Sequence, residues 1–557
     1  MPRDDHIDKP HLPNRKDFHL EKGTVMKSLM KKVFAAAAAI ATVFGLAATT
    51  VATANAADNA TLTVSTTDAK FAGKTVNAYK MFSATVSGDG KAVSYTLTEA
   101  WKKFFNDPNT LGLTGVTDEN VNDKANAYVS KLKDSSLVAF ATKASNWAQN
   151  TANNIKADTT ATVSAAATDG KYTATFTGLD YGYYVVAVPG ATLANTNGQY
   201  ATLVSVDKTK VDSNIKGALP TVDKKVQVGG TGKDATDAKI GDTLNFTLTS
   251  TIPDMSAYNT YTFNFKDTLS KGLTFGQVNE VKVGDTTLTK DTDYSVTTTP
   301  KTSGETLLTV AMLNFKIKQQ ANAGKKITVT YTATLNEQAV VGGAGNPNSA
   351  TIQYSNNPSS NGTGESEPSK VRVFTYGFTV DKYTGDKYDN DATRLAGAEF
   401  TLAPKNGDAM SFVQVSAGNE TTNAVYRVAK DGETGATTTI TTPANGKVDF
   451  QGLKSGEYTL TETKAPAGYN KLASAIGVKV DGKNNGTDTT GATVVITYDN
   501  DNGSNYNQTA SNGVIPVKNK SGAILPGTGG MGTIAFTVIG VLVIALGVAW
   551  TLKRKNA

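Results

Sequence analysis

SGEYTLTETKAPAGY, residues 455–469, is the stretch of this chain that decides its fold. Side chains alternate between the two faces of a β-strand, so Tyr458, Leu460 and Glu462 share one face and the intervening threonines share the other. One apolar and one polar face are typical of a strand in a layered β-protein. The apolar face nevertheless carries a carboxyl group, and burying an unpaired charge is costly. We therefore expect Glu462 to have polar partners inside the core.

The composition extends this pattern to the whole chain. Its 557 residues are enough for about three or four domains. The 51 glycines, the many Thr, Asn, Asp and Ser residues and the scarcity of long helical patterns predict short strands joined by turns, and thus an all-β fold. The net charge of +6 is modest and comes without a basic run, so we expect a solvated surface and no nucleic-acid partner.

The rare residue types exclude several kinds of site. The chain has no cysteine, which excludes disulfides, zinc thiolate sites and cysteine nucleophiles. Its three histidines, His6, His11 and His19, lie close to the start, so removal of that segment also excludes histidine-based triads and metal sites. The loop DNDNGSN at residues 499–505 has oxygen ligands without a full calcium-binding spacing, and we interpret it as a turn. We expect no metal and no cofactor.

Residues 1–56 have the pattern of an exported chain. From Met26, a lysine-rich start is followed by an apolar stretch and by Ala54-Asn55-Ala56, a small-residue cleavage signal. This predicts a secretory signal peptide, with initiation at Met26 and a mature chain that begins near Ala57.

Residues 522–557 combine a short motif with an apolar segment and a basic end. LPGTGG precedes the apolar run of residues 531–552, which is long enough to cross a bilayer as a helix, and Lys553-Arg554-Lys555 follows it. An ordinary membrane anchor is one interpretation. The order of the three parts also resembles the cell-wall sorting signal of Gram-positive surface proteins. That resemblance implies only transient membrane retention, because a sortase would cut between Thr528 and Gly529 in the motif Leu525, Pro526, Gly527, Thr528 and Gly529.

The module at residues 371–521 directs three polar side chains into one apolar interior. Lys382 is in phase with Phe378 and Val380, and Asn519 is in phase with Ile515 and Val517. Together with Glu462, they suit an amide exchange in which the lysine amine attacks the asparagine carboxamide, ammonia leaves and an isopeptide bond remains. Burial lowers a lysine pKa, which frees the nucleophile, and raises a carboxyl pKa, which lets a neutral acid polarise the carboxamide. We therefore assign Glu462 the catalytic role.

These residues resemble the Cna B-type β-sandwich, whose E-box glutamate matches YTLTETKAPAGY. The module at residues 217–370 shows a second set, in which Lys224, Asp267 and Asn348 are each in phase with apolar neighbours. Asp267 is the catalytic acid of this set, and Asn346 is the rival to Asn348. VDKKV, GDTLNFTLTSTIPD and DTLSKGLTF resemble the isopeptide-forming middle domain of Gram-positive fimbrial shaft proteins.

The module at residues 57–216 lacks such a set. GLDYGYYVVAV aligns with GLKSGEYTLTE, and the alignment puts Val188 where Glu462 stands. We expect a related β-sandwich without a cross-link, with inserted helices over residues 97–105 and 120–147. Their aromatic side chains, Trp101, Phe104, Phe105 and Trp147, are expected to pack as core; a ligand-binding surface is the alternative.

The chain as a whole resembles the sortase-assembled backbone pilins of Gram-positive bacteria. The resemblance implies a structural role without enzymatic turnover, a cell-wall-anchored fimbrium as location, and as partners pilin and housekeeping sortases, identical subunits, accessory pilins, peptidoglycan and a host glycan or matrix ligand. The family's tyrosine-proline-lysine-asparagine motif for the inter-subunit lysine is absent. Lys216 is our candidate, with Lys208 and Lys210 behind it.

Two other functions remain open. The first alternative is a monomeric wall-anchored adhesin or a tip or accessory pilin, which would use the same modules as a stalk. A surface glycosidase would need paired carboxyl groups. Asp267 and Glu462 fall in separate modules, each with its own lysine and asparagine, which disfavours an enzyme.

Overall fold

The computed structural model describes most of the chain between residues 59 and 555. The described residues are 59–192, 201–358, 361–388, 390–484, 486, 491–500, 505–522 and 531–555. They form two compact units: the first lies within residues 1–234, 243–333 and 347–372, and the second within residues 235–242, 334–346 and 373–557. The predicted signal peptide and the LPGTG motif, Leu525–Gly529, lie outside the described residues.

Strands between residues 60 and 214 form two sheets. A three-stranded sheet has the order β5-β1-β8, and a five-stranded sheet has the order β3-β2-β6-β7 with β4 on β2. The strands are β1 (Ala60–Thr66), β2 (Thr75–Val86), β3 (Val93–Leu97), β4 (Thr159–Thr162), β5 (Tyr172–Leu179), β6 (Gly182–Ala187), β7 (Ala201–Val206) and β8 (Lys210–Asn214).

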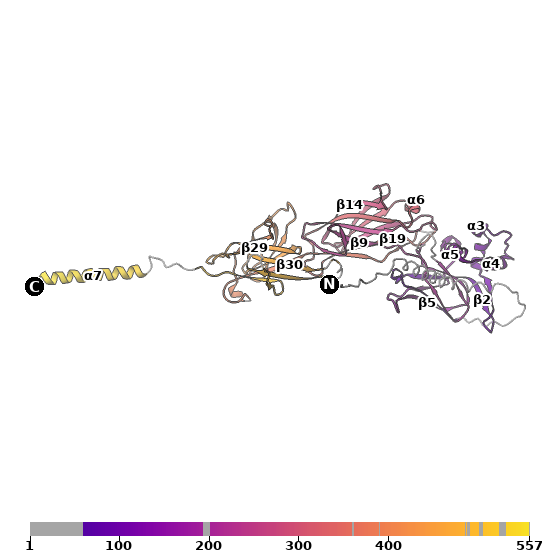
Figure 1. Ribbon diagram of the computed structural model, residues 1–557, viewed down its shortest axis with the longest axis horizontal. Helices are drawn as coiled ribbons and strands as arrows, with labels where there is room; N and C mark the ends of the chain where they lie inside the picture. Colours follow the sequence, from indigo (N-terminus) through magenta and orange to yellow (C-terminus); the bar gives the residue numbers. More distant parts are fainter. Residues whose placement is uncertain are drawn as a thin grey trace, which may run out of the picture. The chain divides into compact units, whose positions relative to one another are not determined.

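A group of short helices is inserted between β3 and β4 (Figure 1). The helices of this module are η1 (Ala69–Phe71), η2 (Glu99–Trp101), α2 (Lys102–Asn106), α3 (Pro108–Leu111), α4 (Val121–Val129), α5 (Asp134–Gln149) and η3 (Thr151–Asn153). Trp101, Phe104 and Phe105 are buried, and the Phe104 ring lies 5.4 Å from Trp147 in an edge-on contact. Trp147 itself is only partly buried. The predicted helical patch is therefore present, with Leu97 ending a strand and a break between α4 and α5.

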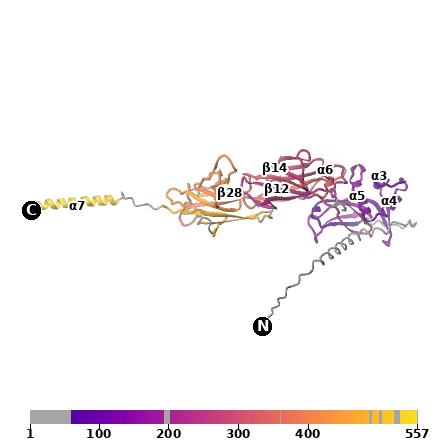
Figure 2. The same ribbon diagram turned by 45° about the horizontal axis from the view of Figure 1, so that its top comes forward.

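Strands between residues 223 and 374 form the next two sheets. One has the order β10-β9-β12-β18-β14-β15, so that β12 and β14 belong to the same sheet (Figure 2). The other contains β21-β19-β13-β17-β16, with β20 on β19. The strands are β9 (Asp223–Val228), β10 (Thr231–Lys233), β11 (Ala235–Asp237), β12 (Thr243–Thr251), β13 (Phe263–Leu269), β14 (Leu273–Val283), β15 (Thr286–Thr287), β16 (Tyr294–Pro300), β17 (Thr306–Met312), β18 (Lys326–Leu335), β19 (Asn346–Ser355), β20 (Thr363–Glu365) and β21 (Ser369–Phe374); the short helices are α6 (Phe315–Gln319) and η4 (Gln320–Asn322).

Strands between residues 376 and 518 form two six-stranded sheets, β26-β24-β25-β28-β22-β33 and β27-β23-β29-β30-β31-β32. β29 and β30 are neighbours in the second sheet (Figure 1). The elements are β22 (Tyr376–Tyr383), η5 (Asp391–Thr393), β23 (Glu399–Pro404), β24 (Phe412–Ser416), β25 (Ala424–Val428), β26 (Ala436–Thr437), β27 (Ile440–Thr441), β28 (Lys447–Leu453), β29 (Gly456–Lys464), β30 (Ile476–Lys483), β31 (Thr493–Asp499), β32 (Gln508–Thr509) and β33 (Val514–Lys518).

The first and last strands pair in parallel in two of the modules. β1 pairs with β8 over Thr61–Ser65, and β22 pairs with β33 over Thr379–Tyr383. Alternating burial along the paired strands places apolar side chains between facing sheets. The predicted all-β class of tandem sandwiches, with helices inserted in the first module, is confirmed.

The C-terminal helix α7 spans Met531–Lys555. Within the part of the chain that the structure describes, no helix was found that is both long and apolar enough to cross a membrane.

Candidate functional site

The middle site consists of Lys224, Asp267 and Asn348, each on a different strand. Lys224 lies on β9 of one sheet, whereas Asp267 and Asn348 lie on β13 and β19 of the facing sheet. Strand alternation turns all three inward, and register places Asn348 opposite Leu269, two residues after Asp267. Each is at most 1% exposed. The structure therefore brings together the three residues that the sequence pattern selected.

A fourth residue, Tyr331 on β18, completes the middle site. Its hydroxyl lies 2.7 Å from Lys224 Nζ, 2.6 Å from Asp267 Oδ2 and 2.7 Å from Asn348 Nδ2. Lys224 Nζ also pairs with Asp267 Oδ2. Sequence reasoning missed Tyr331, because in KITVTYTATL it is one more inward-facing core residue.

Burial lowers the pKa of the lysine in the middle site. Desolvation lowers the pKa of the Lys224 amine to about 8, although the neighbouring Asp267 carboxyl acts in the opposite direction. Lys224 Nζ lies over the rings of Phe246 and Tyr331, 5.2 and 5.1 Å from their centroids. About a tenth of the amine is thus neutral, and nucleophilic, at pH 7.

Asn346, the rival to Asn348, has a different role. Its Oδ1 accepts a hydrogen bond from the Val340 backbone N–H, and its Nδ2 donates to the carbonyls of Val340 and Val373. All its polar atoms thus bind backbone groups, whereas Asn348 Nδ2 meets Tyr331. The geometry favours Asn348 as the carboxamide of the middle site.

The C-terminal site consists of Lys382 on β22, Glu462 on β29 and Asn519, which directly follows β33. All three are at most 2% exposed. Lys382 Nζ lies 2.9 Å from Glu462 Oε1, and Asn519 Nδ2 lies 3.2 Å from Glu462 Oε2. The lysine and carboxyl atoms form an ion pair by distance, but their orientation does not meet hydrogen-bond geometry. The carboxyl group contacts both residues of the predicted bond.

Backbone groups hold the C-terminal site in place. The Leu472 N–H donates to Glu462 Oε2 at 2.7 Å, and Asn519 Nδ2 donates to the Asn470 carbonyl at 2.6 Å. Gly446 has φ +69°, and a Cβ there would lie only 2.6 Å from the carbonyl oxygen of Lys382, so a larger residue would displace the strand. Desolvation also lowers the pKa of Lys382, against the opposing effect of Glu462.

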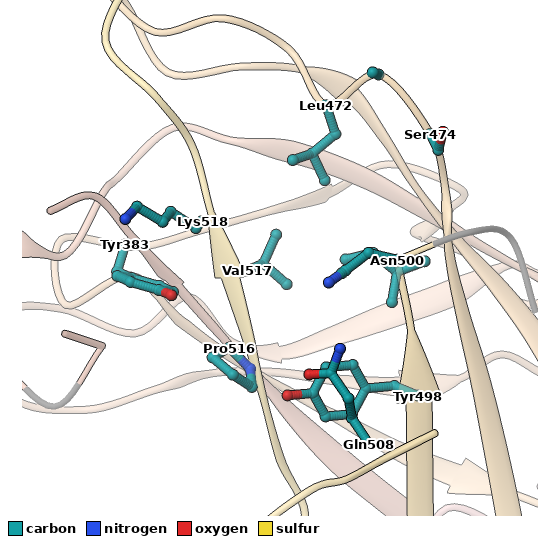
Figure 3. Close-up of a pocket in the computed structure, with 11 residues that line it drawn as sticks. Tyr383, Leu472, Ser474, Tyr498, Asn500, Gln508, Pro516, Val517 and Lys518 are labelled. Atoms are coloured by element: carbon teal, nitrogen blue, oxygen red, sulfur yellow. The ribbon is translucent and has the colours of Figure 1, made fainter. Parts of the chain in front are cut away.

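A pocket of about 430 Å³ lies beside the C-terminal site (Figure 3). It is lined by Tyr383, Leu472, Ala473, Ser474, Ile476, Tyr498, Asn500, Gln508, Pro516, Val517 and Lys518. The three reacting residues are absent from this lining and stay buried between the sheets.

The first module has apolar residues at the equivalent positions. The Ile215 N–H donates to the Ser65 carbonyl, just as the Asn519 N–H donates to the Tyr383 carbonyl. This equivalence places Val64 at the position of Lys382 and Ile215 at that of Asn519. Val188, aligned with Glu462, is buried. None of these side chains can take part in amide exchange.

Other predicted residues lie at the surface or near it. Lys208 and Lys210 are exposed, and Lys216 is partly exposed. Asp499, in the loop interpreted as a turn, accepts hydrogen bonds from the backbone of Asn505 and Tyr506 through Oδ2. Among the residues that the structure describes, no cluster of three or more His, Cys, Asp or Glu side chains suits a metal ion.

Two parts of the chain match known protein families. Residues 240–358 match the family described as Gram-positive pilin backbone subunit 2, Cna-B-like domain, and residues 381–495 match a prealbumin-like fold domain family. The predicted resemblance to Gram-positive backbone pilins is thereby confirmed for the matched residues of the chain.

Two curated relatives match part of this chain. The trypsin-resistant surface T6 protein of Streptococcus pyogenes serotype M6 is 28% identical over 276 residues, which cover 46% of this chain and 44% of that protein. The fimbrial subunit type 2 of Actinomyces naeslundii is 27% identical over 284 residues, 45% of this chain and 50% of that protein. The chain thus spans about half the length of the curated relatives it matches.

Solved pilin structures were also matched. The T6 backbone pilin of Streptococcus pyogenes has 18% identity and a TM-score of 0.42, and the match covers 83% of this chain and 99% of that one. The full-length major pilin SpaD of Corynebacterium diphtheriae has 19% identity and a TM-score of 0.38, with 84% and 98% coverage.

Proposed function

We propose that the chain is the major structural subunit of a covalently polymerised surface pilus, stabilised by Lys224–Asn348 and Lys382–Asn519 isopeptide bonds. The observation that carries this proposal is the presence of two buried lysine, acid and asparagine sets, whose acids, Asp267 and Glu462, each lie in one of the two matched domains. One set alone is also compatible with a satisfied polar cluster. Two sets, built on different strands with different acids, are better explained by a shared chemistry.

The same amide exchange is proposed for both sites. The neutral lysine amine attacks the asparagine carboxamide, ammonia leaves, and the acid polarises the carboxamide and moves the proton. In each site, one carboxyl oxygen and the carboxamide oxygen are buried without a hydrogen-bond partner among the described residues: Asp267 Oδ1 and Asn348 Oδ1, and Glu462 Oε1 and Asn519 Oδ1. A neutral carboxyl group would supply the donor that the carboxamide oxygen lacks.

Assembly would require partners outside this chain. A pilin sortase would cut between Thr528 and Gly529 and join Thr528 to a lysine of an identical subunit, while residues 531–552 retain the precursor at the membrane. A housekeeping sortase would attach the finished fimbrium to peptidoglycan. Accessory pilins and a host glycan or matrix protein are further proposed partners. Each intramolecular bond forms once, so the proposed role includes no enzymatic turnover.

The inter-subunit lysine can be tested by substitution. Lys216→Arg in the native host is expected to abolish the high-mass ladder of wall extracts on a denaturing gel, because arginine keeps the charge but does not attack the sortase acyl intermediate. Lys208→Arg and Lys210→Arg are matched controls that should leave the ladder unchanged. A persistent ladder in Lys216→Arg, or its loss in either control, would contradict the assignment. A wild-type chain that yields only a single band would instead support the adhesin interpretation.

The rate of the Lys224–Asn348 reaction should depend on pH. Only the neutral amine attacks, and its pKa of about 8 means that the neutral fraction of the amine, and with it the rate, rises with pH below that value. Between pH 6 and pH 7 we expect about a tenfold increase. The measurement transfers freshly translated chain to buffers of different pH, stops samples with acid and follows loss of ammonia by mass spectrometry. A rate that falls with rising pH would contradict the proposed nucleophile.

A further inference from the structure

Tyr331 contacts all three groups of the middle site, and its role follows from that position. We propose that the Tyr331 hydroxyl is a catalytic residue of the Lys224–Asn348 reaction, which carries a proton from the attacking amine to the departing carboxamide nitrogen. This inference rests on the isopeptide chemistry proposed above and adds a residue to it. Nothing in the sequence around Tyr331 singles it out.

The hydrogen bonds of Tyr331 use the full capacity of a hydroxyl group. A phenolic oxygen has one donor hydrogen and two acceptor lone pairs. Here the hydroxyl donates to Asp267 Oδ2 and accepts from Lys224 Nζ and from Asn348 Nδ2. The oxygen thus lies between the nitrogen that must lose a proton and the nitrogen that must gain one.

The aromatic neighbours fix the ring that carries this hydroxyl. Phe246 stacks on Tyr331 with a centroid distance of 5.2 Å and an interplanar angle of 16°, and Phe275 packs at 6.0 Å. Tyr331 is completely buried. A side chain held in this way is preorganised, so the proton transfer needs little rearrangement.

The proposed step conserves atoms and charge. Lys224 Nζ bonds to the Asn348 carboxamide carbon, and the C=O electron pair moves onto the oxygen. The added nitrogen passes one proton to the Tyr331 oxygen, while the hydroxyl turns its own hydrogen from Asp267 Oδ2 toward Nδ2 and gives it to that nitrogen. The C–Nδ2 bond then breaks, the C=O bond re-forms and neutral ammonia leaves, while the Lys224 nitrogen keeps one hydrogen as the N–H of the new amide. Tyr331 ends neutral, as it began.

The environment keeps the tyrosine protonated for this task. Burial raises the pKa of Tyr331 well above its ordinary value, and the adjacent Asp267 acts in the same direction. A phenol that does not lose its proton to solvent is available to exchange it with two nitrogen neighbours. Tyr331 therefore acts as a proton relay: it gains one proton as it gives up another, so no separate step is needed to restore its hydroxyl group.

The C-terminal site does the same chemistry with other contacts. There Asn519 Nδ2 donates to the Asn470 carbonyl and to Glu462 Oε2. The carboxyl group itself reaches the departing nitrogen, whereas in the middle site the hydroxyl of Tyr331 occupies that place. The two sites of one molecule therefore provide an internal comparison.

Tyr331→Phe in the ectodomain, residues 57–521, tests the proposal. The expected result is that Lys224–Asn348 bond formation slows by about 10²–10⁴-fold, the range for loss of a general acid–base group, while Lys382–Asn519 forms at the wild-type rate. Freshly translated chain is stopped with acid at intervals, and peptide mapping by mass spectrometry gives the rate at each site. Equal rates at the middle site in variant and wild type would overturn the role of Tyr331.

Tyr261→Phe is the matched control. Tyr261 is a buried tyrosine in the same region, and its hydroxyl has no hydrogen-bond partner among the described residues. We expect this variant to form both bonds at wild-type rates. If it slows the middle bond as much as Tyr331→Phe does, the effect is a general loss of packing and the proposal is wrong.

Replacement of tyrosine by 3-fluorotyrosine covers the case in which Tyr331→Phe does not fold. The fluorinated ring keeps the hydroxyl and its contacts but makes the hydroxyl more acidic, so the rate at the middle site should change while that at the C-terminal site does not. An unchanged ratio of the two rates would overturn the relay. If the wild-type chain forms no Lys224–Asn348 bond, the proposed function of the site fails, which is distinct from a bond that forms without help from Tyr331.

Discussion

Glu462→Ala is expected to abolish the Lys382–Asn519 bond while the Lys224–Asn348 bond still forms, so the purified ectodomain retains one ammonia that the wild-type chain loses. The reason is that Glu462 contacts both reacting residues, at 2.9 Å from Lys382 Nζ and 3.2 Å from Asn519 Nδ2. Loss of a general acid–base group slows such a reaction by about 10²–10⁴-fold. Intact-mass measurement and peptide mapping of residues 57–521 check this result.

The reciprocal variant and a surface control make this test specific. Asp267→Ala should remove the middle bond and leave the C-terminal bond intact, and the double variant should lose no ammonia. Glu457→Ala changes a carboxyl on the same strand as Glu462, but one that pairs with Lys405 outside the core. It should form both bonds. A wild-type ectodomain with an unmodified mass would refute the central proposal.

Asn519→Ala is expected to destabilise the C-terminal module strongly. Because β22 and β33 are the first and last strands of this module, the Lys382–Asn519 bond closes a loop that contains nearly all of it. By the loop-entropy argument used for disulfides, the bond contributes roughly 5 kcal/mol to the free energy of unfolding. For a domain of this size, such a loss lowers the melting temperature by roughly 10–20 °C. Calorimetry of the ectodomain measures the shift.

The Asn519→Ala variant keeps the other two residues of the site, Lys382 and Glu462. Lys382 keeps its ion pair with Glu462, so most of the loss reflects the missing covalent bond and not a bare buried charge. Asn500→Ala removes an exposed asparagine side chain from the same module and should leave its transition unchanged. The bond also joins the two strands through which tension would enter and leave the module. A melting temperature that stays within a few degrees of wild type would contradict a stabilising contribution of this size.

The phase of each strand was enough to select the six residues that we propose to react. In β13, Asp267 follows Phe263 and Phe265 at every second position, and in β29, Glu462 follows Tyr458 and Leu460. A side chain in phase with apolar neighbours must face the core unless the strand is bent. Asn519 lies one residue beyond β33, and phase still placed it correctly because the parallel pairing with β22 continues through the Asn519 N–H.

The sequence by itself determined the all-β fold, the inward direction of the lysines, acids and asparagines, and the presence of Val188 in the first module where Glu462 stands in the last. These follow from alternation along single strands, which is a local property. Only the tertiary structure decided that Asn346 binds backbone groups while Asn348 meets the site, and that Tyr331 lies between Lys224 and Asn348. Those contacts join strands distant in the sequence, and their meeting depends on strand order and sheet packing, which no local pattern encodes.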